Sequence, residues 1–139
     1  MIKIKNHKIC IVVSTYNEDI TFKTLDLSVK ILIEEGLKDI HIIKVPGAFE
    51  IPVVISRLIK KYDGFIAIGC IIKGGTNNFD LICESITNGI MNLSINYKKP
   101  IGNALITVFE KKQAGKRIIK GKEAAQAIIE VLKNEPKKA

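Results

Sequence analysis

A glycine-rich turn after the longest apolar run is the part of this sequence best suited to binding an anion. The run at residues 65–72 ends at Lys73-Gly74-Gly75-Thr76, and a helical pattern begins directly afterwards. A strand, a glycine-rich turn and a helix N-terminus direct backbone N–H groups and the positive end of a helix dipole at one point. Gly75 and Thr76 are therefore candidate phosphate-binding residues, and Thr76 is also a candidate helix N-cap. A phosphorylated small molecule is therefore the first ligand to test. The same residues are also typical of a plain tight turn, which is the alternative interpretation.

A second turn carries an acid within apolar surroundings. In Val45-Pro46-Gly47-Ala48-Phe49-Glu50-Ile51-Pro52, two prolines and a glycine restrict the shape of the loop. Glu50 fits two interpretations. It is either an acid in the first turn of a helix, beside the helix dipole, or an acceptor for the N–H groups of a heterocycle. The Tyr16-Asn17 pair after the first apolar run is likewise either a turn aromatic with a helix cap or part of a site.

Basic residues form a third group. The net charge is +8, and six Lys or Arg residues lie within residues 111–122. Arg117 is suited to bidentate recognition of a phosphate and Lys120 to pairing with a point charge, although each alone is typical of solvated surface. No RNA-binding signature or zinc-finger spacing accompanies them. A basic nucleic-acid-binding α/β domain is thus a further alternative, which steeply salt-dependent DNA affinity would identify. We expect no nucleic-acid partner.

The composition predicts one globular domain, spanning residues 1–139. The chain is 47% hydrophobic and 26% charged. Its longest apolar run is far shorter than the roughly 20 residues that cross a membrane, and the N-terminus lacks the features of a signal peptide. We therefore expect a cytoplasmic protein without membrane contact.

The cysteines and histidines indicate no metal site. Cys10, Cys70 and Cys83 lie in apolar patterns without CxxC spacing, which favours core residues. His7 and His41 are far apart and lack the spacing of metal ligands.

Hydrophobic periodicity predicts four strands alternating with four helices. The strands are expected at 9–13, 40–45, 65–72 and 101–108. The helices are expected from the N-cap Asn17 to the terminating Gly36, around 51–58 and 79–97, and from about Gly121 to Asn134 with Ala124, Ala125, Ile128, Val131 and Leu132 inward. This alternation implies a three-layer α/β/α sandwich with a four-stranded parallel sheet, flavodoxin-like, whose ligands bind beyond the carboxyl ends of the strands.

Together these segments resemble the lumazine synthase family, the 6,7-dimethyl-8-ribityllumazine synthases. The resemblance runs from Ile9 to about Leu132. It is most specific at residues 45–52, at residues 69–74 followed by Thr76 and Phe79-Asp80, and at Lys120-Gly121 with Glu123-Ala124-Ala125.

The resemblance implies a condensation of 5-amino-6-(D-ribitylamino)uracil with 3,4-dihydroxy-2-butanone 4-phosphate, the penultimate step of riboflavin synthesis. No metal or redox cofactor is implied. Alignment of the two reactants supplies most of the acceleration, an effect of about 7–11 kcal/mol in well-oriented systems.

The resemblance also implies the binding residues. Tyr16 takes the place of an aromatic that stacks on the pyrimidine, and Lys120 that of a lysine close to the site. Gly75, Thr76 and Arg117 bind the phosphate. The ribityl chain and ring are lined by Ala48, Phe49 and Glu50 and by backbone groups of Cys70, Ile71 and Ile72. The family pocket lies between neighbouring subunits of a homopentamer, so Asn103 and Arg117 are expected to reach the pocket of the adjacent chain.

The sequence departs from the family pattern at the catalytic position. Asn78 stands where the family has a proton-transferring histidine, and an amide does not titrate near neutral pH. Either water and substrate groups carry the protons, or the protein is a non-catalytic flavin- or lumazine-binding oligomer of the same fold. Asn103 replaces a common phenylalanine.

The assembly has two alternatives. The segment between Arg117 and Lys120 looks a few residues shorter than in the family. We therefore expect a free pentamer rather than a sixty-subunit shell.

Overall fold

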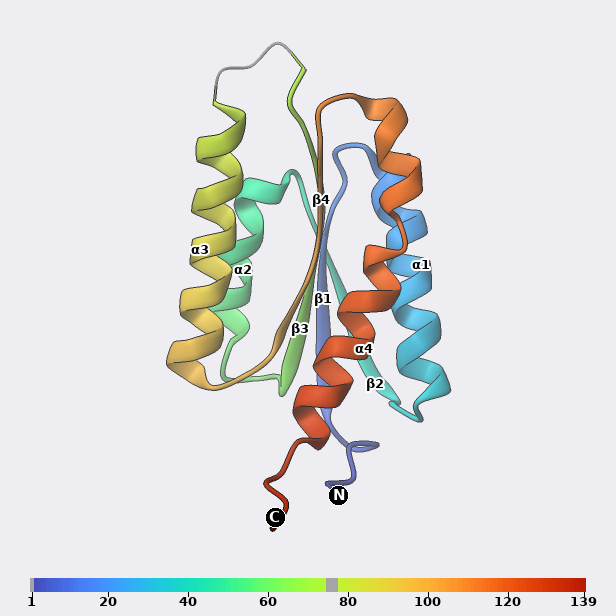
Figure 1. The fold of residues 1–139 in the computed structure, drawn as a ribbon, viewed down its shortest axis with the longest axis vertical. Coiled ribbons are helices and arrows are strands. Elements are labelled where there is room, and N and C mark those ends of the chain that lie inside the picture. Colours follow the sequence, from blue (N-terminus) through green and yellow to red (C-terminus); the bar gives the residue numbers. More distant parts are fainter. Residues whose placement is uncertain (1, 75–77) are drawn as a thin grey trace.

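Four parallel strands form the centre of the molecule, in the order β2-β1-β3-β4 (Figure 1). The computed structural model describes residues 2–74 and 78–139. The strands are β1 (Lys8–Ser14), β2 (Asp39–Val45), β3 (Gly64–Ile72) and β4 (Ile101–Val108). All three pairings are parallel, so the predicted sheet is confirmed, with each strand within one residue of its expected start and end.

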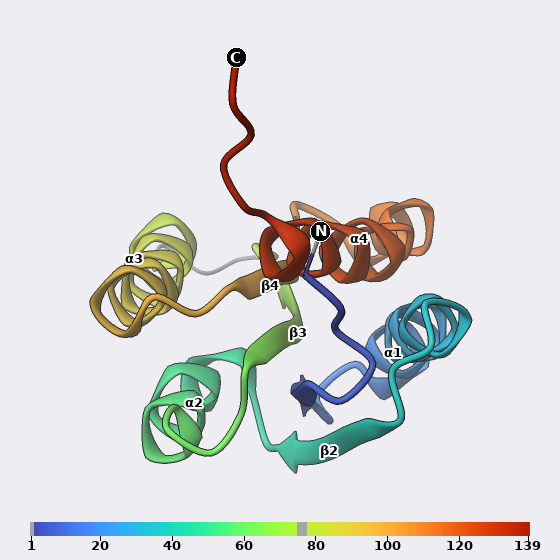
Figure 2. The same ribbon diagram turned by 90° about the horizontal axis from the view of Figure 1, so that it is seen from below.

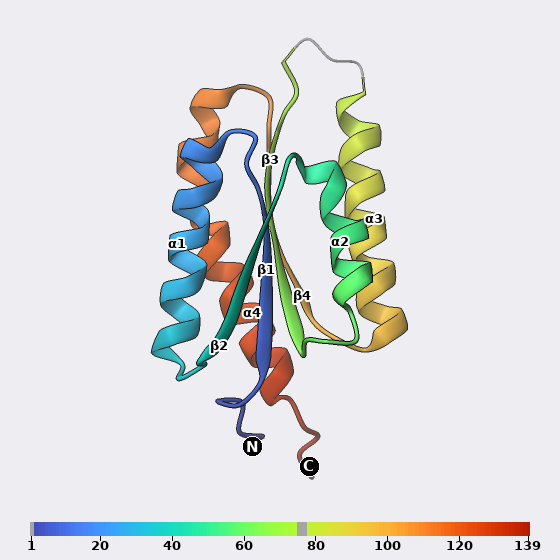
Figure 3. The same cartoon turned by 180° about the vertical axis from the view of Figure 1, so that it is seen from behind.

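Helices cover both faces of this sheet, which confirms the three-layer α/β/α architecture. Figures 2 and 3 show α1 (Glu18–Glu34) and α4 (Lys120–Lys133) on one face and α2 (Ile51–Leu58) and α3 (Phe79–Tyr97) on the other. Two short 3₁₀ helices, η1 (Ala48–Glu50) and η2 (Lys111–Arg117), follow β2 and β4. No helix in the described part of the chain is long and apolar enough to cross a membrane.

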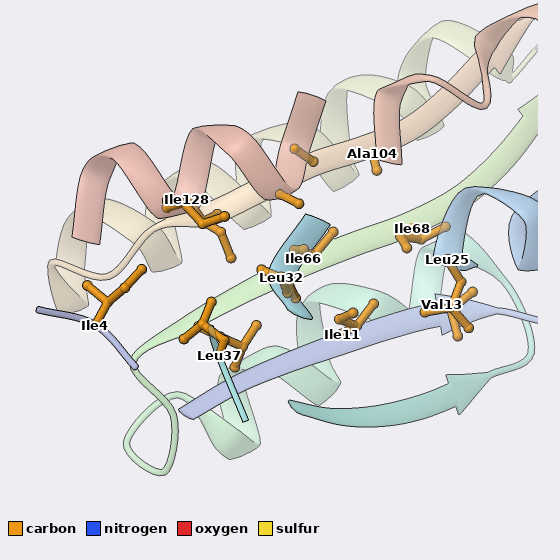
Figure 4. Close-up of a cluster of buried hydrophobic side chains, with 14 residues drawn as sticks. Ile4, Ile11, Val13, Leu25, Leu32, Leu37, Ile66, Ile68, Ala104 and Ile128 are labelled. Carbon is orange, nitrogen blue, oxygen red and sulfur yellow. The ribbon is translucent and has the colours of Figure 1, made fainter. Parts of the chain in front are cut away.

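The core lies on both faces of the two central strands because successive side chains of a strand point to opposite faces. Ile11, Val13, Ile66 and Ile68 pack toward α1 and α4 (Figure 4). Alternate residues of the same strands pack toward α2 and α3, namely Cys10, Val12, Phe65 and Ala67. Burial of both faces explains why these strands read as continuous apolar runs.

The two ends of α1 are built differently from one another. Its C-terminus ends as predicted, because Gly36 has φ +93° and the N–H groups of Gly36 and Leu37 donate to the carbonyls of Ile33 and Leu32. Asn17 does occupy the N-cap, but its backbone is left-handed, with φ 59°, and its side chain forms no capping hydrogen bond. The capping mechanism that the sequence predicted for Asn17 is therefore wrong.

Two further predictions need correction. The helix after the glycine-rich turn begins at Phe79, with Asn78 at its N-cap, whereas the predicted N-cap, Thr76, lies outside the described residues. In α4, Val131 is 56% exposed and Ile129 is buried in its stead. Val131 faces past β4, and β4 is the edge strand, so no further strand of the described chain covers that side chain.

Candidate active site

The turns after the four strands meet at one end of the sheet, and both termini lie at the other (Figure 1). Parallel strands place all their carboxyl ends at the same edge, where ligands of open α/β sheets bind. The segments that the sequence singled out, after Ser14, Val45, Ile72 and Val108, are these turns.

Tyr16 is held beside the turn that follows β2. The β1–β2 pairing continues past the strand ends, since the N–H of Thr15 donates to the carbonyl of Val45 (2.8 Å) and that of Tyr16 to the carbonyl of Pro46 (3.0 Å). The side chain of Tyr16 is 70% exposed. An aromatic ring on a fixed backbone with a free face is suited to stacking on a flat ligand.

The turn after β2 combines an exposed aromatic with a partly satisfied carboxylate. Phe49 is exposed, Ala48 is buried, and Glu50 is half-buried. The Oε1 atom of Glu50 accepts a 3.0 Å hydrogen bond from the N–H of Gly47, so the acid stabilises its own turn. Its second carboxylate oxygen has no hydrogen-bond partner among the described residues and is available to accept from a ligand.

The tip of β3 has a neighbouring strand on one side only. Its pairing with β1 ends at Ile68, opposite Val13, but its pairing with β4 continues to Ile72, opposite Val108. Among the described strands, residues 69–72 are thus flanked by β4 alone. Backbone groups in this stretch, which contains Cys70, Ile71 and Ile72, are placed to meet a ligand.

The thiol of Cys70 does not take part in this edge. Its side chain is 4% exposed and packs among Ile20, Ile106 and Ala114. Burial raises the pKa of the Cys70 thiol to about 11, so the group is neutral at physiological pH and is no nucleophile. The side chain of Cys70 is therefore a core residue, and the contact of its backbone with a ligand stays a prediction.

Ser14, the last residue of β1, is a polar residue that sequence analysis missed. It is fully buried, and its Oγ has no hydrogen-bond partner among the described residues. By strand alternation it lies on the same face as Cys10 and Val12, the face covered by η1 and α2. A serine after an apolar run gave no signal of its own, and only the orphaned hydroxyl marks it as a candidate ligand contact.

The glycine-rich turn is described only at its two ends. Gly74 has φ +51°, a left-handed conformation that favours glycine. Gly75 and Thr76 lie outside the described residues. Asn78 is exposed at the N-cap of α3 and forms no side-chain capping bond.

A second group of predicted residues lies along the open edge of β4. The Oδ1 of Asn103 accepts from the N–H of Leu105 (3.0 Å), and the Nζ of Lys120 donates to the carbonyl of Leu105 (2.8 Å). Burial lowers the pKa of Lys120 from its usual 10.5, nearby Glu123 opposes this, and Arg117 adds to it. A hollow of about 270 Å³ here is lined by Asn103, Leu105, Thr107 and Lys120 and by α3 residues Cys83, Glu84, Thr87 and Asn88. Arg117 is exposed at the end of η2.

The strand order separates the two groups. Tyr16 and the turn with Phe49 and Glu50 follow β1 and β2, whereas Asn103 lies on β4, with β3 in between. The open edge of β4 faces away from β1. One chain therefore carries two separate groups of candidate residues, named here the first half-site (around Tyr16 and Glu50) and the second half-site (around Asn103 and Lys120).

Comparison with known proteins gives a single family. Residues 6–135 match the family model described as 6,7-dimethyl-8-ribityllumazine synthase. Three similar curated proteins carry that same name. The one from Cutibacterium acnes is 36% identical over 132 residues, which are 90% of this chain and 80% of the relative. The one from Limosilactobacillus reuteri is 33% identical, with 93% and 90% covered, and the one from Bdellovibrio bacteriovorus is 35% identical, with 90% and 73% covered.

Proposed function

The chain belongs to the 6,7-dimethyl-8-ribityllumazine synthase family, and from this premise we propose that it catalyses the condensation named for that family. The substrates are 5-amino-6-(D-ribitylamino)uracil and 3,4-dihydroxy-2-butanone 4-phosphate, and water and inorganic phosphate leave as the lumazine ring closes. The protein is a transferase of riboflavin biosynthesis. The alternative of a non-catalytic flavin-binding oligomer has no support from the relatives, since those named above are called synthases.

The first half-site is the observation that carries this proposal. Tyr16 and Phe49 are exposed aromatics on adjoining turns, and Glu50, the neighbour of Phe49, has one carboxylate oxygen bonded to the N–H of Gly47. In the proposal, the rings stack on the pyrimidine, the free oxygen of Glu50 accepts an N–H of the substrate, and backbone groups of residues 70–72 bond the ring edge. Ala48 forms the floor of this pocket.

The phosphate is bound at the end of the same pocket. Gly75 and Thr76 supply N–H groups and a hydroxyl, and Arg117 of a neighbouring chain supplies a guanidinium that binds two phosphate oxygens at once. Asn103 and Lys120 come from the same neighbouring chain. The separation of the two half-sites by β3 supports a pocket completed between two copies.

Catalysis in this pocket is mainly alignment of two reactants. The primary amine of the pyrimidine attacks the carbonyl of the butanone and one water leaves. Elimination of phosphate then gives an enol that becomes a second carbonyl, and the ribityl-bearing amine attacks this carbonyl and closes the ring with loss of a second water. Asn78 orients a water molecule or a substrate hydroxyl at the position where protons move, because its amide can donate and accept hydrogen bonds but does not titrate. The protons themselves pass through water and substrate groups.

The assembly in this proposal is a homopentamer in the cytoplasm. Large apolar side chains on the α2 and α3 side of the chain are exposed and suit burial between copies, namely Val53, Leu81, Met91 and Ile95. Only Ile118 and Ile119 separate η2 from α4, and this short link supports a free pentamer rather than a shell of sixty chains. Light scattering tests the assembly, and a particle of about sixty chains would refute the free pentamer.

The function is tested by mixing the pure protein with both substrates and following lumazine fluorescence. We expect product well above the uncatalysed rate. If the protein binds the lumazine but forms product no faster than buffer alone, the synthase proposal is wrong and the non-catalytic binding alternative is supported.

A further inference from the structure

Phe109, the first residue after β4, contacts both described segments that flank residues 75–77. On the β3 side, the N–H of Gly74 donates to the carbonyl of Phe109 (3.3 Å), and the Nζ of Lys73 lies 5.3 Å from the centroid of its ring. On the α3 side, the ring of Phe79 lies 6.0 Å from that of Phe109, centroid to centroid, with an angle of 47° between the planes. One side chain therefore joins the two ends of the turn.

The backbone of Phe109 is itself fixed from the other direction. The Oε1 of Gln113 accepts hydrogen bonds from the N–H groups of both Phe109 and Glu110, each at 3.0 Å. The N–H of Gln113 in turn donates to the carbonyl of Glu110 (3.0 Å), and the neighbouring Ala114 is fully buried. Phe109 is therefore anchored by the start of η2, independently of the turn that it contacts.

The exposure of Phe109 does not fit a core residue. Its side chain is 59% exposed, whereas Phe79 is 7% exposed. The ring covers Phe79 on one side and offers its face to the Lys73 ammonium, a pairing worth about 0.5–1 kcal/mol at exposed sites, or about two- to fivefold in an equilibrium constant. This contact holds the Lys73 cation over the ring of Phe109 at the end of β3.

We propose that Phe109 is a positioning residue for the phosphorylated substrate, which keeps the Lys73 ammonium at the end of β3, where the phosphate is proposed to bind, and holds the first turn of α3 against the end of β4. The role rests on the proposed function, because the anion is the phosphate of the butanone substrate. It adds Phe109 and Lys73 to that site, neither of which sequence analysis had assigned to it.

The test separates the two substrates. In Phe109→Leu we expect the KM for the butanone phosphate to rise about two- to fivefold, while the KM for the pyrimidine stays unchanged, since in this proposal Lys73 pairs with the phosphate alone. Phe109→Tyr keeps the ring and restores the wild-type KM. The matched control is Tyr97→Leu, which removes a half-exposed aromatic from the far end of α3.

A double-mutant cycle with Lys73→Met identifies the cause. If the ring acts by holding the ammonium, the double variant is no weaker for phosphate than Lys73→Met alone. Because Lys73 is exposed, we expect Lys73→Met to fold even if Phe109→Leu does not. The KM of Lys73→Met for the butanone phosphate then tests the proposal without the Phe109 variant. An unchanged KM for the butanone phosphate in Lys73→Met, or strictly additive losses in the cycle, would overturn the proposal.

A binding measurement keeps this inference distinct from the proposed function. Titration with inorganic phosphate, followed by calorimetry, needs no turnover, and we expect Phe109→Leu and Lys73→Met to weaken its affinity by similar factors. If the wild type makes no lumazine but the variants weaken phosphate binding, the positioning role stands and the synthase activity fails. If the wild type is active and all variants bind phosphate equally well, the synthase activity stands and the positioning role fails.

Discussion

Ala48 lies directly against the α-carbon of Gly69. A Cβ on Gly69 would stand 2.9 Å from the Cβ of Ala48, 3.2 Å from Leu105 and 3.3 Å from Ile51. The turn that carries Phe49 and Glu50 can therefore rest on β3 only because residue 69 has no side chain. This contact fixes how closely the turn that carries Phe49 and Glu50 packs on the sheet.

Gly69→Ala should accordingly loosen that half-site. We expect a loss of about 1–3 kcal/mol in the free energy of unfolding, as for other overpacked cores, and a raised KM for the pyrimidine because the turn is displaced. Urea unfolding and steady-state kinetics measure the two effects. Gly115→Ala is the control, since nothing lies within 4 Å of a Cβ there. Equal stability of the two variants would contradict the close contact.

Arg117→Ala should impair use of the phosphorylated substrate far more than binding of the pyrimidine. Hydrogen bonds to charged groups contribute about 1.5–3 kcal/mol, so we expect the KM for the butanone phosphate to rise roughly 10- to 100-fold. Arg57→Ala, which removes an arginine from the last turn of α2, controls for net charge. Equal losses for both substrates would remove Arg117 from the phosphate site.

Asn78→His should increase turnover if proton transfer limits the rate. A positioned general acid or base contributes typically about 10²–10⁴-fold, and a gain of at least about tenfold in kcat is expected here. The pH profile should acquire a limb near pH 6.5, about the ordinary pKa of histidine. Asn92→His, on an exposed position of the same helix, is the control. An unchanged kcat and pH profile would show that water and substrate groups already suffice.

Lys120 should make stability depend on pH in the alkaline range. Burial lowers its pKa in the folded protein from the 10.5 of the unfolded chain, so the unfolded state binds more protons between the two values. The free energy of unfolding of wild type, relative to Lys120→Met, should therefore rise as the pH approaches 10.5 and be lowest well below the folded pKa. Urea titrations over a pH series measure this difference.

The exposed Lys122 supplies the comparison for that series, through Lys122→Met in the same helix. The prediction is contradicted if the stability difference between wild type and Lys120→Met stays flat or falls as the pH rises toward 10.5. Burial would then not lower the pKa of Lys120 in the folded protein. The hydrogen bond from Lys120 to the Leu105 carbonyl contributes in both pH ranges and does not change the direction of the trend.

Local pattern predicted the strands and helices and the turns that follow the strands. The alternating strands and helices follow from periodicities of about 2 and 3.6 residues, and Gly36 ended α1 where a glycine was expected. Local pattern failed at Asn17, whose side chain forms no capping bond because its backbone is left-handed. It failed also at Val131, where helical periodicity could not show that β4 is an edge strand.

The amino-acid sequence by itself determined the family, the four strands and helices, and which turns carry chemically useful residues. Tertiary structure alone decided that β3 separates Tyr16, which follows β1, from Asn103 on β4, and that Gly69 must make room for Ala48. It also decided that Ser14 buries a hydroxyl without a partner among the described residues, and that Phe109 contacts both Lys73 and Phe79. The physical reason is the distance along the chain over which each kind of interaction acts. Helix and strand preferences act over a few neighbouring residues. Strand order and close contacts arise between segments tens of residues apart, and the hydrophobic pattern of each segment does not reveal them.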